Sequence, residues 1–165
     1  FNALVATGPT AAQYGKAFDS ISICLSKGLG APVGSLLLGN AAFIKKARRV
    51  RKVFGGGMRQ AGMLAAAGLY ALQNHVSLLK TDHDHARQIA DALAKKSFIK
   101  EILPVETNII IAEIGESWTP QSFVAKMKEH GVLLFAFSPT RIRIVVHLDI
   151  TPAMVEETIQ IIDQL

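Results

Sequence analysis

The chain has 165 residues and a mass of 17.8 kDa; half of its residues are hydrophobic and 19% are charged. This composition excludes an intrinsically disordered chain, and the ordinary counts of 13 glycines and 6 prolines exclude a collagen-like one. A single cysteine excludes a disulfide framework and a cysteine-rich zinc module, and it makes the cytoplasm the expected compartment.

Positive charge is concentrated in one segment. The formal net charge is +5, and seven of the 18 lysines and arginines lie within residues 45–59, which contain no acidic residue. The rest of the chain carries 11 basic residues against 13 acidic ones. Such a local cluster can bind nucleic acid, a phosphate ligand or an acidic partner, or it can be a solvated helix face.

The first third of the chain predicts two strands and a helix. Residues 1–15 show no clear periodicity, whereas residues 19–25 alternate apolar and polar side chains as a strand does. A glycine-rich loop, residues 26–32, leads to the apolar run 33–38, which predicts a buried strand. Residues 41–53 have the spacing of an amphipathic helix.

Two further helices are predicted next. Residues 59–80 are apolar nearly all round, which predicts a deeply buried helix. Residues 81–96 predict a second helix, with Thr81 and Asp84 at capping-box spacing. Its core stripe consists of Ala86, Ile89, Ala90 and Leu93. The Asp-His-Asp-His run at 82–85 predicts a solvated helix start rather than a metal site, because residues i and i+2 do not share a helix face.

The remaining residues predict a compact α/β unit. Strands are expected at 98–103, 107–114, 132–137 and 141–147. Helices are expected to begin at Thr119 and at Thr151, each followed by proline, and Gly131 is expected to end the first of them. The order β-β-α-β-β-α indicates helices packed on a sheet.

Lys27 is the first candidate for chemistry. It follows a predicted strand, in a glycine-rich turn between apolar segments. A lysine that is poorly hydrated there would supply a neutral amine, which is the nucleophile of Schiff-base chemistry. The alternative is an ordinary exposed loop lysine.

The second candidate is the glycine triplet at residues 55–57. Three glycines ahead of a predicted helix are similar to an anion-binding element, in which backbone N–H groups and the helix N-terminus face the ligand. Lys52 and Arg59 flank the triplet with positive charge. The alternative is a flexible hinge.

The third candidate is Arg143. Arg141 and Arg143 have the same parity in a predicted strand and therefore share one face. An arginine fork there would suit a carboxylate, whereas the alternative is a pair of exposed edge-strand arginines. Cys24 is expected to be a small packing residue, and His147 and Asp149 to have a structural hydrogen-bonding role.

Three blocks together resemble a known family. The string SICLSKGLGAPVGS at 22–35, the block from Arg51-Lys52 through GGGMRQAG at 55–62, and the segment SPTRIR through His147-Leu148-Asp149 resemble low-specificity L-threonine aldolases. Thr107-Asn108 matches a further block, and the blocks occur in order over nearly the whole chain. These are fold-type-I enzymes that depend on pyridoxal 5'-phosphate (PLP).

The resemblance implies roles for four residues. Lys27 would carry PLP as a Schiff base, and Arg143, four residues before the His-Leu-Asp motif, would hold the substrate carboxylate. Lys52 and Arg59 match basic residues placed near the cofactor phosphate, and no metal is implied. The implied activity is carbon–carbon cleavage of L-threonine and L-allo-threonine to glycine and acetaldehyde.

The resemblance also implies an organisation. Residues 1–60 would form the end of the PLP-binding large domain, and residues 61–165 the connecting helices and a small C-terminal α/β domain with helices on a mainly antiparallel sheet. The chain begins at Phe1 and matches the C-terminal half of the family, so we expect the 165-residue chain alone to be inactive. The resemblance implies that the parent enzyme is a homo-oligomer, a dimer or a homotetramer. We expect no nucleic-acid or membrane partner.

Two alternatives stay open at this point. One is a different fold-type-I lyase or transferase, against which the GGGMRQ block argues. The other is a non-enzymatic module that binds polyanions through residues 45–59, although few aromatic residues are interleaved there to stack on bases.

Overall fold

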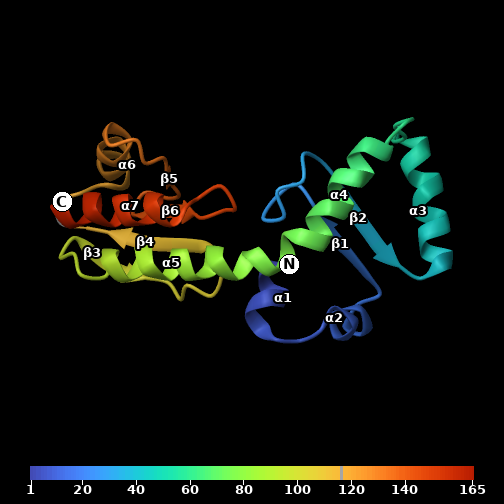
Figure 1. Cartoon of the computed structure of the whole chain (residues 1–165), viewed down its shortest axis with the longest axis horizontal. Coiled ribbons are helices and arrows are strands. Elements are labelled where there is room, and N and C mark those ends of the chain that lie inside the picture. The colour runs from blue at the N-terminus through green and yellow to red at the C-terminus, as the bar shows by residue number, and fades with distance from the viewer. Residues whose placement is uncertain (116) are drawn as a thin grey trace. The chain divides into compact units, whose positions relative to one another are not determined.

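A computed structural model describes residues 1–115 and 117–165. The chain forms two compact units, Phe1–Leu78 and Leu79–Leu165, which are considered separately (Figure 1).

The first unit is a two-stranded ribbon with helices. Its elements in chain order are α1 (Asn2–Thr7), α2 (Ala11–Ala17), β1 (Ser20–Cys24), β2 (Ser35–Gly39), α3 (Ala41–Val53), α4 (Gly62–Asn74) and the 3-10 turn η1 (Val76–Leu78). The sequence pattern did not predict α1 or α2. A capping box begins α2, because the Thr10 hydroxyl accepts from the N–H of Gln13 while the Gln13 side chain accepts from the N–H of Thr10.

Strands β1 and β2 pair antiparallel, with Ser20 opposite Gly39 and Cys24 opposite Ser35. The prediction of a strand near 33–38 is confirmed, but its predicted burial is wrong, because all five residues of β2 are exposed. Cys24 is exposed as well, so its expected packing role is also wrong. Within the described residues only β1 pairs with β2, so one edge of each strand and much of both faces have no covering element.

Helix α3 has the predicted bounds. Its first turn is capped by Asn40, whose Oδ1 accepts a 2.9 Å hydrogen bond from the N–H of Phe43. Helix α4 is shorter than the predicted 59–80 and is not deeply buried: only Gly68 and Ala71 of its residues are buried, whereas Met63 is 85% exposed. Apolar composition on every side makes burial favourable, but burial also needs neighbours, and this unit covers only one side of α4.

The second unit is a four-stranded antiparallel sheet with three helices. The strands are β3 (Ile99–Ile102), β4 (Ile109–Ile114), β5 (Phe135–Ala136) and β6 (Arg141–Val145), in the order β3-β4-β6-β5. The helices are α5 (Leu79–Leu93), α6 (Pro120–Glu129) and α7 (Pro152–Gln164). Figure 1 shows α5 and α7 alongside the sheet. The predicted β-β-α-β-β-α order on an antiparallel sheet is confirmed.

One face of this sheet carries the core. Ile110 and Ala112 of β4 and Ile142 and Ile144 of β6 are buried in one cluster with side chains from all three helices. The predicted stripe of α5 is confirmed, because all four of its residues belong to this cluster. Since strand residues alternate between faces, Ile111, Arg141 and Arg143 lie on the opposite face.

Local signals set most helix ends correctly in this unit. Thr119 and Thr151 cap α6 and α7 through their hydroxyls, and Gly131 takes a positive φ of 81° just beyond α6. Helix α5 departs from the prediction, since it begins at Leu79 rather than at Thr81. The segment 82–85 therefore lies within the helix, and three of its four residues are buried: Asp82, His83 and His85. The expected solvated helix start is wrong.

Asn108 joins β4 to the end of β6. Its side-chain Nδ2 donates to the carbonyl of Val146 at 2.7 Å, its carbonyl accepts from the N–H of Val146 at 2.9 Å, and it is buried. We expect Asn108→Ala to lower the free energy of unfolding of this unit by about 1–3 kcal/mol, because the buried carbonyl of Val146 would lose the hydrogen bond from the Asn108 side chain. The fluorescence of Trp118, the single tryptophan, during urea denaturation measures this. Gln160→Ala, on the exposed side of α7, is the control; an equal effect in both variants would contradict the assignment.

Candidate cofactor and substrate site

Lys27 lies in an ordered loop between β1 and β2. The N–H of Leu25 donates to the carbonyl of Gly34 at 2.9 Å, and the N–H of Gly30 donates to the carbonyl of Lys27 at 2.8 Å. Gly30 and Gly34 have φ values of 66° and 117°, which side-chain-bearing residues rarely adopt. The backbone that carries Lys27 is therefore held in one conformation.

Two buried apolar residues and a contact with His75 anchor this loop. Leu29 and Ala31 are buried, and the Leu29 carbonyl lies 2.6 Å from Nδ1 of His75, next to the end of α4. Tyr70 packs its ring edge-on to the same histidine at 5.4 Å. Sequence reasoning missed His75, because no local pattern connects it to a loop 46 residues away. Lys27 itself is exposed, so the poor hydration predicted for it is absent in this chain.

The glycine triplet ends α3 rather than beginning a helix. The N–H of Gly55 donates to the Lys52 carbonyl at 3.1 Å, and the N–H of Gly56 donates to the Arg51 carbonyl at 2.8 Å. Gly55 has a φ of 81°, as expected for a left-handed C-terminal cap. Since α4 begins only at Gly62, the predicted anion cradle of triplet amides and a helix N-terminus is wrong.

The basic side chains near the triplet remain available to a ligand. All seven lysines and arginines of residues 45–59 are exposed, including Lys52 and Arg59. The Lys52 Nζ lies close to Gly57, 3.5 Å from the position a Cβ would take there. These cations can neutralise a phosphate through their side chains, without the backbone element that the sequence had indicated.

The two arginines of β6 have different partners. Arg141 stands opposite Glu113 of β4; its Nε lies 3.2 Å from the Glu113 carboxylate, and its Nη2 lies 3.6 Å from that of Glu101. Among the described residues Arg143 forms no ion pair, and its buried Nε has no hydrogen-bond partner. Its guanidinium lies over the ring of Phe137 at 5.9 Å.

This arrangement decides between the two readings of the arginine pair. Strand β6 is an inner strand, between β4 and β5, so the edge-strand alternative is wrong. A buried N–H donor without an acceptor is costly, and an incoming carboxylate oxygen would satisfy it. Arg143, and not the ion-paired Arg141, is the arginine free to receive an anionic ligand.

His147 and Asp149 follow the same strand. The His147 Nδ1 lies 3.4 Å from the Asp149 carboxylate and accepts a 3.4 Å hydrogen bond from the Asp149 N–H. Both side chains are exposed. The contact closes the short turn that leads into α7.

The acid and histidines at the start of α5 are buried titratable groups. Burial raises the pKa of Asp82, and the neighbouring His85 and His147 oppose this increase. Burial lowers the pKa of His83, and Arg87 adds to the decrease. Within residues 1–115 and 117–165, no group of three or more His, Cys, Asp or Glu side chains is placed to hold a metal ion.

The lowered pKa of His83 predicts acid sensitivity. The stability that depends on neutral His83 is complete above its ordinary pKa of 6.5, and it is lost as the pH falls from 6.5 through the folded-state value. Between pH 7 and pH 5 we expect the second unit to lose more unfolding free energy than a His83→Gln variant, with a difference in slope of at most about 1.4 kcal/mol per pH unit.

Urea denaturation followed by Trp118 fluorescence at each pH measures this difference. The other four histidines are present in both proteins and cancel in the comparison. Parallel pH profiles for the two proteins would contradict the assignment.

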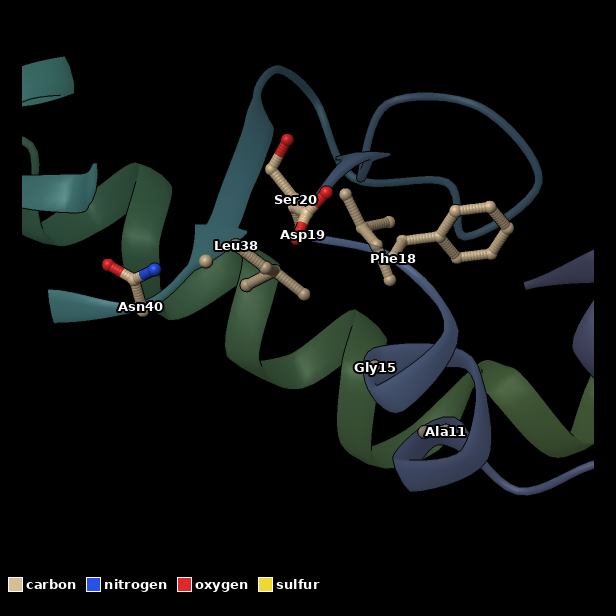
Figure 2. Close-up of a pocket in the computed structure, with 9 residues that line it drawn as sticks. Ala11, Gly15, Phe18, Asp19, Ser20, Leu38 and Asn40 are labelled. Atoms are coloured by element: carbon tan, nitrogen blue, oxygen red, sulfur yellow. The ribbon is translucent and has the colours of Figure 1, made fainter. Parts of the chain in front are cut away.

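A pocket of about 360 Å³ lies elsewhere in the first unit (Figure 2). It is lined by α2 residues, by the start of β1 and by the end of β2: Ala11, Gly15, Phe18, Asp19, Ser20, Ile21, Leu38, Gly39 and Asn40. This is the Ser20–Gly39 end of the ribbon, whereas Lys27 follows the Cys24–Ser35 end. The pocket is therefore distinct from the Lys27 loop.

The described residues fit the cofactor that the sequence implied. The first unit offers an exposed primary amine on a fixed loop, which suits an aldehyde, and a segment of exposed cations, which suits a phosphate. The second unit offers an unpartnered arginine donor, which suits a carboxylate.

Comparisons with known proteins identify the family of this chain. The family model of β-eliminating lyases matches residues 1–117. The chain is 43% identical to low-specificity L-threonine aldolase 1 of Arabidopsis thaliana over 99% of its own length and 47% of the relative. It is 45% identical to the low-specificity L-threonine aldolase of Escherichia coli K12, over 95% of this chain and 46% of that one. The chain thus spans about half the length of the curated relatives it matches.

Solved structures show the same fold. A Listeria monocytogenes protein assigned as an L-allo-threonine aldolase superposes with a TM-score of 0.78 at 16% identity, over 99% of this chain and 49% of that one. Histidinol-phosphate aminotransferase of Clostridium acetobutylicum superposes with a TM-score of 0.67 at 11% identity, over 96% and 50%.

Among the described residues, no helix is long and apolar enough to cross a membrane.

The family match covers more than half of the chain, and the superpositions supply the fold. The chain therefore belongs to the β-eliminating lyase family and has the fold of the corresponding half of the fold-type-I enzymes that use pyridoxal phosphate.

Proposed function

We propose that this chain is the C-terminal half of a low-specificity L-threonine aldolase, which cleaves L-threonine and L-allo-threonine to glycine and acetaldehyde. The observation that carries the proposal is Arg143, a buried, unpartnered arginine donor beside an arginine whose charge is already satisfied. The identity of 43–45% to two threonine aldolases supports the choice of substrate.

The residues of this chain have two roles, cofactor binding in the first unit and substrate binding in the second. Lys27 holds the cofactor through Nζ and, as a free amine, can carry a proton at the same atom. Lys52 and Arg59 place positive charge for the cofactor phosphate. When bound, pyridoxal phosphate accepts electron density from the substrate Cα, which allows the Cα–Cβ bond of a β-hydroxy amino acid to break.

Arg143 orients the substrate through its carboxylate. A guanidinium that binds the α-carboxylate through two parallel hydrogen bonds fixes the rotation of the substrate about Cα. Over the whole reaction the β-hydroxyl loses its proton as acetaldehyde forms, and Cα gains a proton as glycine forms. Lys27 Nζ is a group of this chain that can deliver that proton.

The organisation of the parent protein is part of the proposal. Residues 1–60 end the cofactor-binding large domain, and residues 61–165 form the connecting helices and the small domain. The term whole enzyme is used below for the full-length protein, which contains this chain and a segment equivalent to the remaining half of its relatives. We place the whole enzyme in the cytoplasm as a homo-oligomer, a dimer or tetramer. Exposed apolar side chains on α4, such as Leu69 and Tyr70, support the need for further packing partners.

The test is the cleavage of L-threonine and L-allo-threonine by the whole enzyme. Acetaldehyde is measured by its reduction with NADH and an alcohol dehydrogenase, and glycine is measured separately in equal amount. Formation of a keto acid without acetaldehyde, or elimination of the β-hydroxyl as water, would contradict the aldolase proposal and favour another fold-type-I activity.

We expect the 165-residue chain alone to give no measurable acetaldehyde. Lys27 is exposed in this chain, so water reaches the amine, whereas the reaction requires a site that excludes water. The same coupled assay, on a chain whose intact mass has been verified, measures this. Acetaldehyde formation above the rate measured without protein would contradict the expectation.

A further inference from the structure

Phe137 is the aromatic partner of the unpaired arginine. The Arg143 Cζ lies 5.9 Å from the centroid of the Phe137 ring, within the range of a cation–π interaction. The backbone of Phe137 is tied to β6, because its N–H donates to the Arg141 carbonyl at 2.8 Å. Phe137 is 48% exposed and does not belong to the core of the unit.

The two arginines are oriented by different chemistry. Carboxylates of Glu113 and Glu101 orient Arg141 and occupy its donors. No hydrogen bond or ion pair from the described residues orients Arg143. An aromatic ring attracts a guanidinium group through the face of the ring. The ring does not act as a strong hydrogen-bond acceptor for the N–H groups that lie in the plane of the guanidinium. Phe137 can therefore orient Arg143 and leave its charge and donors available.

We propose that Phe137 is a positioning residue, which holds the Arg143 guanidinium in the plane where Nε and an Nη bind the substrate carboxylate together. This inference rests on the proposed function of Arg143. An arginine side chain loses much rotational freedom when it binds a ligand, and a preorganised one loses less. The benefit of the ring thus appears in substrate affinity, because the carboxylate is bound equally in the ground state and the transition state.

The test compares Phe137→Leu with Phe137→Tyr in the whole enzyme. Leucine keeps apolar bulk and removes the aromatic face, whereas tyrosine keeps the face. We expect Phe137→Leu to raise KM for L-threonine about 3–10-fold with kcat changed less than about twofold, and Phe137→Tyr to keep KM within about twofold of the parent value. Denaturation followed by Trp118 fluorescence verifies that both variants are folded.

A double-mutant cycle tests whether the effect passes through the arginine. In an Arg143→Lys background we expect Phe137→Leu to raise KM by less than half of its factor in the parent, since the plane of a guanidinium is no longer there to be held. If Phe137→Leu lowers the unfolding midpoint, Phe137→Met gives the same comparison with a more adaptable side chain.

The outcomes separate the two proposals. An unchanged KM in Phe137→Leu together with a raised KM in Arg143→Leu overturns the role of Phe137 and leaves the proposed function standing. An unchanged KM in Arg143→Leu overturns the role of Arg143, and the inference fails with it. Equal loss in the leucine and tyrosine variants, or a fall in kcat alone, also overturns the positioning role.

Discussion

Replacing Lys27 with alanine in the whole enzyme is expected to lower kcat for threonine cleavage by about 10⁴-fold, because the amine that holds the cofactor is lost. Lys27→Arg is expected to fail as badly, since a guanidinium keeps the positive charge but does not form an imine with an aldehyde. The coupled acetaldehyde assay measures kcat, and the visible absorbance of the protein measures bound cofactor.

Lys16→Ala is the matched control, because Lys16 is also an exposed lysine of the first unit, on α2. We expect it to retain full activity. Borohydride reduction followed by peptide mapping should label the peptide that contains Lys27. Full activity of Lys27→Ala, or a label on a different lysine of the folded protein, would contradict the assignment.

Arg143→Leu is expected to lower kcat/KM for L-threonine about 100-fold, mostly through KM. The substitution removes a paired, charge-assisted contact to the substrate carboxylate, and hydrogen bonds to charged groups contribute about 1.5–3 kcal/mol. Arg143→Lys should recover part of this loss, because an ammonium keeps the charge but not the fork. Initial rates over a range of threonine concentrations separate KM from kcat.

Arg141→Lys is the control for this experiment. Arg141 lies on the same face of the same strand, but Glu113 and Glu101 occupy its guanidinium. A lysine can keep one ion pair to Glu113, so we expect KM to stay within about twofold of the parent value. If Arg141→Lys raised KM as much as Arg143→Lys, the structural distinction between the two arginines would not hold in catalysis.

Local sequence signals determined three helix ends of the second unit. Thr119, Thr151 and Gly131 act within a single turn of helix, where a side chain or a positive φ is sufficient to satisfy the terminal backbone groups. The alternating pattern of β6 likewise placed Arg141 and Arg143 on one face, since strand periodicity is a property of the backbone.

Burial was predictable only where the covering element belongs to the same unit. The stripe of α5 packs into the core as expected, because the sheet and α7 are present to cover it. The β2 strand and α4 have more apolar sequences, yet most of their side chains are exposed. Apolar composition states a tendency to leave water, and only the tertiary structure decides whether a partner surface is available.

The glycine triplet shows the limit of a motif that has two uses. Glycines beside a helix serve either an anion cradle or a C-terminal cap, and the sequence 55–57 fits both. The choice depends on which helix end is near, and the hydrogen bonds to the Arg51 and Lys52 carbonyls make it a cap. Nothing in the three residues themselves differs between the two outcomes.

For the candidate site, the sequence by itself determined the residue types and their order: a lysine after a strand, cations around a glycine turn, and two arginines on one strand face. The resemblance indicated Arg143 as the carboxylate-binding arginine, and the tertiary structure decided which of the two arginines is ion-paired. Glu113 and Glu101 belong to other strands, and only strand pairing brings their carboxylates to Arg141 and leaves Arg143 with an aromatic ring. Whether two charged side chains form an ion pair depends on distances of a few ångströms across the sheet, and the spacing of residues along one strand does not determine these distances.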